Sequence, residues 1–524
     1  MHRYLSVALL VAGCTGTQVT SAPPRTSPPA VRTPELVSKI PSQSTAKPER
    51  RVLAAVPPAP SECNDFRAHA LGATFDCSDR KHALTALDRA LQEANAMARD
   101  AALAALSSCS GLESGVVLAL RAEYAPAACG DVIVGDFVEL NKPKLTSGIA
   151  DALSGLKLAA QLTRLVRSAP QIAQPYTKER IDAFVRGVMA TWATEQANAI
   201  GELSIKGARL TGYGKGLVAI DAGLADMRFV EIFRQVPLPE EFANDPELAE
   251  AYYSALDQGL EPRKARGRDA ALVGLRLFSE VGALHDSRVG EARRQLSRLY
   301  NGRRIDALDS LLLPPLEAPT LADEEHRLAV KLPTFYVAFV LGATDPAQVD
   351  MLRALFEQGL PAAVHMRLER AVLSPVMQQL YARSLFELGR TYWRAADFAA
   401  AAKIGTNHST VSEVNTLISA LSHALENGPR DAAAMMLGGT QLGALGSLSE
   451  LDSLAKGKGL NAALAAYDAA LVRELGPAGT ADVEFYKDLA SRYERAAALL
   501  KDPALKKVAR ERAAAAAETA KKLH

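Results

Sequence analysis

Hydrophobic residues recur at helical spacing along much of this chain. Between residues 181 and 192 the apolar positions fall at i, i+3, i+4, i+7, i+8 and i+11, which is one face of a helix. They are Ile181, Phe184, Val185, Val188, Met189 and Trp192. A similar rhythm returns near the end of the chain, at Phe485, Tyr486, Leu489, Tyr493 and Ala497. We expect one continuous apolar stripe in each segment, packed against a neighbouring helix.

Several helices are expected to begin at a cap residue followed by proline. The cap side chain accepts hydrogen bonds from unpaired amides of the first turn. Proline at the first helical position sacrifices no hydrogen bond, because an amide there has no partner within the helix. The four sites are Asp245-Pro246, Asp345-Pro346, Ser374-Pro375 and Asp502-Pro503.

Two further segments predict helices of different kinds. Residues 80–107 predict one helix. Residues 331–343 are apolar but are interrupted by Pro333. Because about 20 apolar residues are needed to span a bilayer, we expect a short buried helix there.

The composition favours a helical body. Hydrophobic residues make up 48% of the 524 residues and aromatic residues only 6%, which favours close-packed helices over sheets of β-branched and aromatic residues. The expected fold is all-α, with irregular stacked helical hairpins. The net charge of +1 gives no electrostatic reason to expect nucleic acid as a partner.

The first 14 residues carry the features of an export signal. A positive start is followed by the apolar stretch Leu5–Val11, which is too short to span a bilayer. The next residues, Val11-Ala12-Gly13-Cys14, resemble the lipobox of bacterial lipoproteins. The resemblance implies that Cys14 receives a diacylglyceryl group and becomes the new N-terminus. The alternative is an ordinary signal peptide and a released soluble protein.

The segment after Cys14 is expected to be a tether. Residues 14–60 contain ten prolines among small and polar residues, and such a composition does not pack a core. Thr15 follows the lipobox cysteine, whereas aspartate there implies retention at the inner membrane in some bacteria. The expected location is therefore the cell envelope, as an outer-membrane lipoprotein facing the periplasm or the cell surface.

Four more cysteines, Cys63, Cys77, Cys109 and Cys129, lie near one end of the expected body. In an exported chain such an even set predicts two disulfides. A single helix over 80–107 would hold Cys77 and Cys109 roughly 40 Å apart, whereas a disulfide requires Cα atoms within about 7 Å. Unless that helix is broken, this argument excludes one of the three possible pairings. Of the other two we favour Cys63–Cys77 with Cys109–Cys129, because each bond closes a short loop. The sequence contains no Cys-x-x-Cys spacing that would favour zinc.

One segment has the signature of a helical repeat. In residues 385–404, Leu388, Gly389 and Tyr392 and then Asp397, Phe398 and Ala401 resemble the two helices of a tetratricopeptide repeat. Gly405 and His408 depart from that pattern, and no constant 34-residue period runs through the chain. The resemblance implies an irregular repeat-like array in the C-terminal half, with Tyr392, Trp393 and Phe398 as candidate partner-binding residues.

Residues 263–304 form a basic cluster. They hold eleven Arg or Lys against four acidic residues. Arg293 and Arg294 are candidates for contact with an anionic partner. The alternative is that these residues lie on the outer faces of amphipathic helices.

Proline runs and composition divide the chain into six expected regions. A break is predicted where Pro314, Pro315 and Pro319 follow a helical run that they cannot continue. The regions are a signal peptide (1–13), a Pro-rich disordered tether (14–60), a Cys-containing helical region (61–135), a middle helical region (136–315), a Pro-containing linker (316–333) and a C-terminal helical domain (334–524).

Two classes of function remain open. The sequence contains no nucleotide-binding, zinc-protease or hydrolase motif, so no catalytic residue, cofactor or metal ligand is expected. The favoured interpretation is a membrane-anchored binding or scaffolding protein with a protein partner in the envelope. The alternatives are an envelope enzyme and a structural part of a secretion or outer-membrane assembly complex. Convergent buried carboxylates or histidines would favour the enzyme, and an apolar or basic groove the scaffold.

We predict that Cys14 is lipidated. Mass spectrometry of the N-terminal peptide of the envelope-derived protein should show a diacylated Cys14, and Cys14→Ser should abolish palmitate labelling because the acceptor thiol is lost. Thr15→Ser, which leaves the lipobox intact, is the control. An unmodified mature N-terminus at another position would contradict the prediction.

Overall fold

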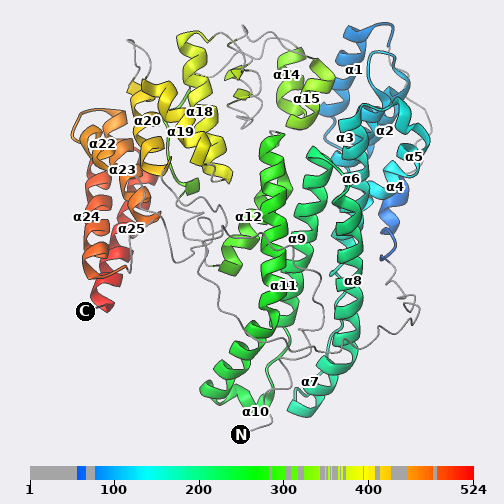
Figure 1. Ribbon diagram of the computed structural model, residues 1–524, viewed down its shortest axis with the longest axis horizontal. Coiled ribbons are helices and arrows are strands. Elements are labelled where there is room, and N and C mark those ends of the chain that lie inside the picture. The colour runs from blue at the N-terminus through cyan, green and yellow to red at the C-terminus, as the bar shows by residue number, and fades with distance from the viewer. Residues whose placement is uncertain are drawn as a thin grey trace, which may run out of the picture.

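The computed structural model describes residues 56–66, 77–281, 286–300, 308–316, 324–342, 373–392, 395–406, 413–426, 447–475 and 481–523, with a few positions between 349 and 369. Every regular element within these ranges is helical and none is a strand (Figure 1). The prediction of an all-α protein is confirmed. The signal peptide, Cys14 and most of the expected tether lie outside the described residues.

The N-terminal part consists of short helices, drawn in blue and cyan in Figure 1. Its elements are η2 (Ser61–Phe66), α1 (Arg80–Gln92), α2 (Ala96–Ala105), η3 (Leu106–Ser108), α3 (Ser114–Tyr124), η4 (Ala127–Cys129), α4 (Gly130–Val134), α5 (Phe137–Asn141) and η5 (Lys142–Lys144).

The four body cysteines form two disulfides, but in other pairs than expected. Cys63 is bonded to Cys129 and Cys77 to Cys109, with Cα separations of 5.1 and 5.3 Å. Cys63, Cys109 and Cys129 are buried in the hydrophobic core.

The prediction against a Cys77–Cys109 bond is wrong because residues 80–107 do not form one helix. Helix α1 ends at Gln92, and Asn95 caps α2 by accepting hydrogen bonds from two amides of its first turn. The two helices pack against each other, so the chain reverses and its two cysteines meet. The sequence feature that marks this break is an asparagine, a residue that favours helix caps, inside a segment with helical spacing of apolar residues.

The point where the chain enters the body is held by Arg164. Its guanidinium donates hydrogen bonds to the carbonyl of Pro57, at 2.9 Å, and to the carbonyl of Ala128, at 2.7 Å. It also pairs with the Asp131 carboxylate at 2.6 Å. Arg164 is only 7% exposed, so these contacts fix residues 56–60 against the end of α6.

Long helices and the short segments between them form the centre of the molecule, drawn in teal and green in Figure 1. They are α6 (Ser147–Arg164), α7 (Lys178–Phe184), the π-helical segment η6 (Val185–Met189), α8 (Ala190–Gly207), α9 (Gly212–Arg234), α10 (Glu240–Ala243), α11 (Pro246–Glu280) and α12 (Ser287–Tyr300). Helix α9 packs against α6, α8, α11 and α12. It is buried on nearly all sides and lies at the core of this part.

Glycine allows the neighbouring helices to approach α9 closely. A Cβ atom on Gly214 would collide with the carbonyl oxygen of Asp151 in α6. A Cβ atom on Gly223 would lie 2.7 Å from the backbone nitrogen of Ala271 in α11. The backbones at these crossings are therefore in direct contact, and no larger side chain fits between them.

The apolar stripe between residues 181 and 192 is interrupted in the structure. Ile181 and Met189 are buried, but Val188 is 60% exposed. The π-helical segment adds a residue to the turn and rotates the positions that follow it. The prediction of a continuous α-helical stripe therefore fails at Val188. Beyond the π-helical segment, the side chain of Trp192 packs against the core again and stacks on Phe229, with ring centroids 5.6 Å apart.

The predicted short buried helix is confirmed as α15 (Thr334–Leu341), in which Tyr336, Val337 and Val340 are buried. It follows α14 (Glu324–Lys331), so the expected linker 316–333 contains a helix. The Tyr124 hydroxyl donates a hydrogen bond to the Lys331 carbonyl at 2.7 Å. These helices therefore pack on the N-terminal part.

The C-terminal helices are α18 (Pro375–Tyr392), α19 (Ala395–Thr406), α20 (Glu413–Glu426), α22 (Ser449–Leu454), α23 (Leu460–Leu475), α24 (Val483–Leu499) and α25 (Pro503–Lys522). Along this part α18 contacts α19, α19 contacts α20, α23 contacts α24 and α24 contacts α25. One hydrophobic core contains residues from all three expected helical regions of the body. A repeat array remains a prediction.

The repeat-like segment forms the helix pair that its motif predicts. A Cβ atom on Gly389 would lie 3.0 Å from the ring of Phe398, which is fully buried between α18 and α19. The small residue and the aromatic residue therefore fit each other across the pair. Phe398 also packs edge-on against Phe386, at 5.6 Å between ring centroids.

Three of the predicted helix starts are confirmed, and the fourth, Asp345-Pro346, lies outside the described residues. Asp245 and Asp502 each accept hydrogen bonds from two amides of the following turn. The Ser374 hydroxyl accepts one from the Met377 amide at 3.4 Å. Among the described residues, no helix has the length and apolar character needed to cross a membrane.

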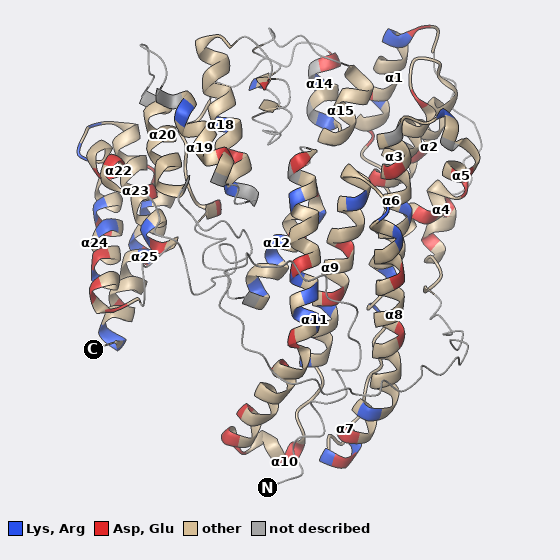
Figure 2. Ribbon diagram, in the orientation of Figure 1, with Lys and Arg blue, Asp and Glu red and all other residues tan. Residues whose placement is uncertain are grey.

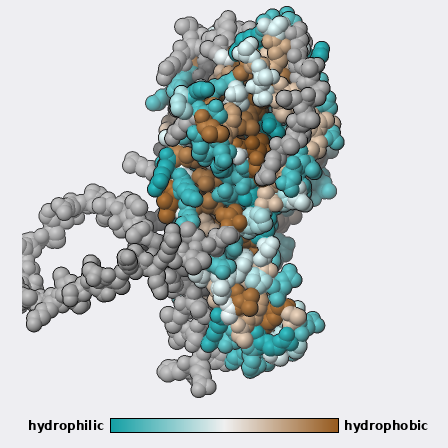
Figure 3. All heavy atoms as spheres, turned by 90° about the vertical axis from the view of Figure 1, so that its right-hand side faces the viewer, coloured by the Kyte–Doolittle hydropathy of each residue, from teal (hydrophilic) through white to brown (hydrophobic). Residues whose placement is uncertain are grey.

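In the part of the chain that the structure describes, large exposed hydrophobic residues are scattered rather than grouped on one helix. Leu140, Val188, Ile205 and Leu460 are each more than half exposed and lie on different helices or at distant turns. On the face seen in Figure 3, hydrophobic residues lie among hydrophilic ones.

We predict opposite effects of alanine at two glycines. Gly214→Ala should lower the free energy of unfolding by about 1–3 kcal/mol because the methyl group has no space at the α6–α9 crossing. Gly201→Ala, on α8, should raise it by about 0.5–1 kcal/mol because no atom lies within 4 Å of the added carbon. Urea unfolding followed by circular dichroism measures both. Equal midpoints would contradict the close crossing.

Candidate functional site

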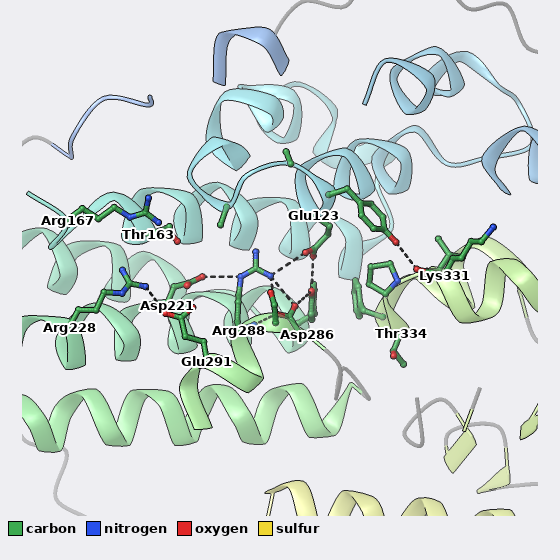
Figure 4. Close-up of a pocket in the computed structure, with 18 residues that line it drawn as sticks. Glu123, Thr163, Arg167, Asp221, Arg228, Asp286, Arg288, Glu291, Lys331 and Thr334 are labelled. Carbon is green, nitrogen blue, oxygen red and sulfur yellow. Dashed lines mark hydrogen bonds and ion pairs between the residues drawn. The ribbon is translucent and has the colours of Figure 1, made fainter. Parts of the chain in front are cut away.

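A cavity of about 660 Å³ lies where the N-terminal and central helices meet α14 and α15 (Figure 4). Charged side chains contributed by α3, α9, α12 and α14 form much of its wall. The lining residues are Glu123, Tyr124, Ala125, Ala127, Thr163, Arg167, Tyr213, Asp221, Arg228, Asp286, Ser287, Arg288, Glu291, Lys331, Leu332, Pro333, Thr334 and Phe335.

Local structure explains why α12 presents its charges here. Asp286 precedes the helix and accepts a hydrogen bond from the Arg288 amide at 2.8 Å, as an N-terminal cap does. Glu291 follows Arg288 by three residues, so both side chains lie on one face. Asp221 and Arg228 are seven residues apart on α9 and share a face for the same reason.

Arg288 is the centre of the charge network. Its guanidinium lies 3.0 Å from Asp286, 3.4 Å from Glu123 and 3.4 Å from Asp221. The arginine side chain is 13% exposed, and each of the three carboxylates is less than 10% exposed. One buried cation therefore faces three buried acids, which a folded protein tolerates only if some acid is protonated or further cations are near.

Two tyrosines complete the network. The Tyr213 hydroxyl lies 2.8 Å from Glu123 and 3.0 Å from Asp286, and the Tyr336 hydroxyl donates to Glu123 at 3.1 Å. Burial raises the pKa of both tyrosines well above its usual value, so each hydroxyl keeps its proton. Burial also raises the pKa of Glu123, against the attraction of Arg288. A protonated Glu123 would relieve the excess of negative charge.

Asp221 differs from the other two acids. Burial raises its pKa from 3.8 to about 6, opposed by the attraction of Arg288 and Arg228. Its Oδ2 atom is buried and has no hydrogen-bond partner in the described part of the chain. The same is true of Arg288 Nε and of Arg228 Nη1. Asp221 Oδ2 and Arg288 Nε lie 3.4 Å apart and form an ion pair without a hydrogen bond. A buried group without a hydrogen bond costs about 1–3 kcal/mol, and Arg228 Nη1 is such a group in the wall.

The cavity has two ends of different charge. In Figure 4, Arg167 and Arg228 lie on one side and Glu123 and Asp286 on the other, with Asp221 between them. Arg167 is exposed, and Arg228 pairs only loosely with Glu291, at 3.6 Å. Glu291 shares the arginine end and Arg288 lies among the carboxylates, so the two ends differ in their excess of charge. This arrangement suits a polar ligand with groups of both signs.

The backbone before Arg167 is strained. Val166 has a φ of 62°, in a region that β-branched residues rarely adopt. The Val166 side chain is buried, and its amide donates a hydrogen bond to the Gln196 side chain at 2.9 Å. These contacts hold the turn that places Arg167 at the cavity, and strain of this kind is common at binding sites.

The candidate partner-binding residues do not gather into one surface. Arg293 is 7% exposed and pairs with Asp309, whereas Arg294 is exposed. Phe398 is fully buried. The predictions of surface roles for Arg293 and Phe398 are therefore wrong, because both side chains are used inside the body. The side chains of Tyr392 and Trp393, and all of Cys14, lie outside the described residues.

The basic cluster 263–304 is largely matched by acids from other helices. Arg263 and Arg266 bind the buried carboxylate of Asp226, at 3.0 and 2.6 Å. Figure 2 shows both signs of charge along α9, α11 and α12. Within the described part of this segment, Arg263, Arg266 and Arg288 balance acids that α3 and α9 bury. Arg276 and Arg298 are exposed, and each pairs with a glutamate.

Sequence reasoning missed Glu123, Asp221 and Arg288. The available signal was an acidic residue inside an apolar helix: Asp221 interrupts "GLVAIDAGLADM", and Glu123 follows "GVVLALRA". A helix that is apolar all round is buried, so an acid within it must have a partner.

No family model, curated protein or solved structure matches this chain. The fold and the cavity thus define, over the residues described, an all-α protein with a charged internal site.

We predict that Asp221 makes the protein less stable as the pH rises from about 4 to 6. In this window the unfolded chain has released the proton of Asp221, whereas the folded chain still holds it. Folded protein therefore binds more protons, and the free energy of unfolding falls by up to about 3 kcal/mol across the window. Asp221→Asn should flatten this slope in urea unfolding at successive pH values.

The control is Asp182→Asn, which removes a half-exposed carboxylate paired with Arg186 on the surface. Glu123 contributes a slope of the same sign, so some dependence should remain in Asp221→Asn. The same slope in Asp221→Asn and in the unmodified protein would contradict the prediction.

Proposed function

We propose that the protein is a membrane-anchored envelope lipoprotein whose helical body is a binding module. Three features support this proposal. The Val11-Ala12-Gly13-Cys14 sequence resembles a lipobox, and a Pro-rich segment separates it from the body. Two disulfides in the N-terminal part are typical of proteins that fold outside the cytosol.

The cavity is the binding site in this proposal. The observation that carries it is a 660 Å³ space whose wall contains buried charged atoms without a hydrogen bond among the described residues. They are Arg228 Nη1 and the ion pair of Asp221 Oδ2 with Arg288 Nε, which are 3.4 Å apart. Ligand sites in proteins are concave, of this size, and fix their ligands through a few polar groups. A small polar ligand would supply the missing partners of Asp221 and Arg228.

A protein partner in the envelope remains part of the proposal. The face predicted from Phe398 does not support it, because that ring is inside the α18–α19 pair. Arg294 on α12 is exposed and remains a candidate contact.

An envelope enzyme is the second candidate. It is favoured by three buried carboxylates that converge on one arginine, with Asp221 at a pKa of about 6. A carboxyl group whose pKa lies close to the working pH is suited to acid–base catalysis. In this reading Asp221 would exchange a proton with the substrate near neutral pH.

We predict that a small molecule is retained by the full lipoprotein purified in mild detergent from its own envelope. Native mass spectrometry should show an added mass that is lost in Asp221→Asn and kept in Asp182→Asn, because only Asp221 lies at the cavity. Identical spectra for Asp221→Asn and the unmodified protein would contradict the proposed site. Conversion of the retained molecule during incubation would favour the enzyme over the binding protein.

A further inference from the structure

The division of charge in the cavity restricts the chemistry of its ligand. Arg288 is surrounded by three carboxylates, at 3.0–3.4 Å, and has little capacity left for a ligand anion. The Lys331 ammonium binds Asp88 at 2.7 Å and is likewise engaged. The cations left to meet a ligand are Arg167 and Arg228, which lie together on one side of the cavity in Figure 4.

A ligand group that binds the carboxylate of Asp221 must donate a hydrogen bond. The side chain is 4% exposed, its Oδ2 atom has no hydrogen-bond partner among the described residues, and Arg288 Nε lies 3.4 Å away without a hydrogen bond. An ammonium group carries three donors and a positive charge, so it can approach such a carboxylate and also reach the acids beyond it. A neutral hydroxyl would supply a donor but no charge.

A ligand group that binds Arg167 and Arg228 must accept hydrogen bonds. Arg228 Nη1 is buried without a hydrogen-bond partner in the described structure, and the planar guanidinium matches a carboxylate in geometry. The strained backbone at Val166 holds Arg167 close to this place. Arg228 follows Asp221 by two helical turns, which separates the acceptor-binding and donor-binding ends by roughly 10 Å along α9.

The size and the remaining wall favour a ligand longer than a single ion. The volume of about 660 Å³ lies within the range of pockets that enclose drug-sized ligands. Leu332, Pro333 and Phe335 line the same cavity and offer apolar contact to a short aliphatic part. A molecule with an ammonium at one end, a carboxylate at the other and small side chains between them fits these features.

We propose that the cavity binds a short zwitterionic peptide, with its ammonium group at Asp221 and its terminal carboxylate at Arg228 and Arg167. This inference rests on the proposed function, because it assigns a ligand class to the site proposed there.

Titration calorimetry at pH 7.5 on the full chain tests the proposal with four probes. They are alanyl-alanine, its N-acetyl form, its C-terminal amide and glucose. Alanyl-alanine should bind, and each blocked form should bind at least tenfold more weakly because it leaves a buried charge without a partner. Glucose, which carries hydroxyls but no charge, should not bind.

Two variants assign the two ends of the peptide. Asp221→Asn should remove the preference for the free over the acetylated amine but keep the preference for the acid over the amide. Arg228→Gln should do the reverse. Asp182→Asn, far from the cavity on α7, should bind all four probes as the unmodified protein does. This crossed pattern separates loss of a specific contact from general misfolding, which would remove all binding.

Equal affinity for the three peptide probes, or tighter binding of glucose, would overturn the proposal. If no peptide binds but native mass spectrometry still shows an Asp221-dependent ligand, the ligand class is wrong and the binding function stands. If neither a bound probe nor a retained molecule is found, both proposals fail.

Discussion

The buried guanidinium of Arg288 is the interaction on which the centre of this structure depends. It lies within 3.4 Å of acids from α3, α9 and the start of α12, and Tyr336 joins α15 to the same network through Glu123. Removing one member of such a group leaves a buried charge without a partner, which costs several kcal/mol. The same network closes one wall of the cavity, so the stability of this part and the shape of the site have a common origin.

Close packing around α9 makes this network possible. Glycines at the crossings with α6 and α11 bring the backbones into contact, and this leaves little freedom for the charged side chains beyond them. The acids on α9 are thereby held in fixed positions: Asp226 toward Arg263 and Arg266, and Asp221 toward Arg288. A buried acid on a rigid helix needs a partner at a defined place. The arginines of α11 and α12 supply it, but the Asp221 oxygen that faces Arg288 makes no hydrogen bond within the described residues.

Local chemistry explains what the sequence predicts well. Helical rhythm, proline after a cap residue, and the Gly389–Phe398 pair depend on neighbours within a few turns, and the structure confirms the all-α fold, three helix starts and the paired helices. The predictions fail where contacts between segments far apart in the sequence determine the structure. Cys77 meets Cys109 because one helix ends at Gln92 and Asn95 caps the start of the next. Arg293 is charged, but it is buried because it pairs with Asp309 from another segment. The ring of Phe398 is buried because it packs on Phe386 across the helix pair. The cavity joins residues from 123 to 335, and no local pattern places them together.

The attachment of residues 56–60 determines where a pulling force on the chain acts on the body. Arg164 holds the carbonyl of Pro57 and also grips Ala128 and Asp131. Its neighbour Thr163 is part of the cavity wall, and so is Arg167, three residues beyond the end of α6. A force applied to the chain ahead of Pro57 is therefore delivered to the last turn of α6, beside the rim of the site. The attachment of residues 56–60 and the rim of the cavity therefore lie at the same end of α6.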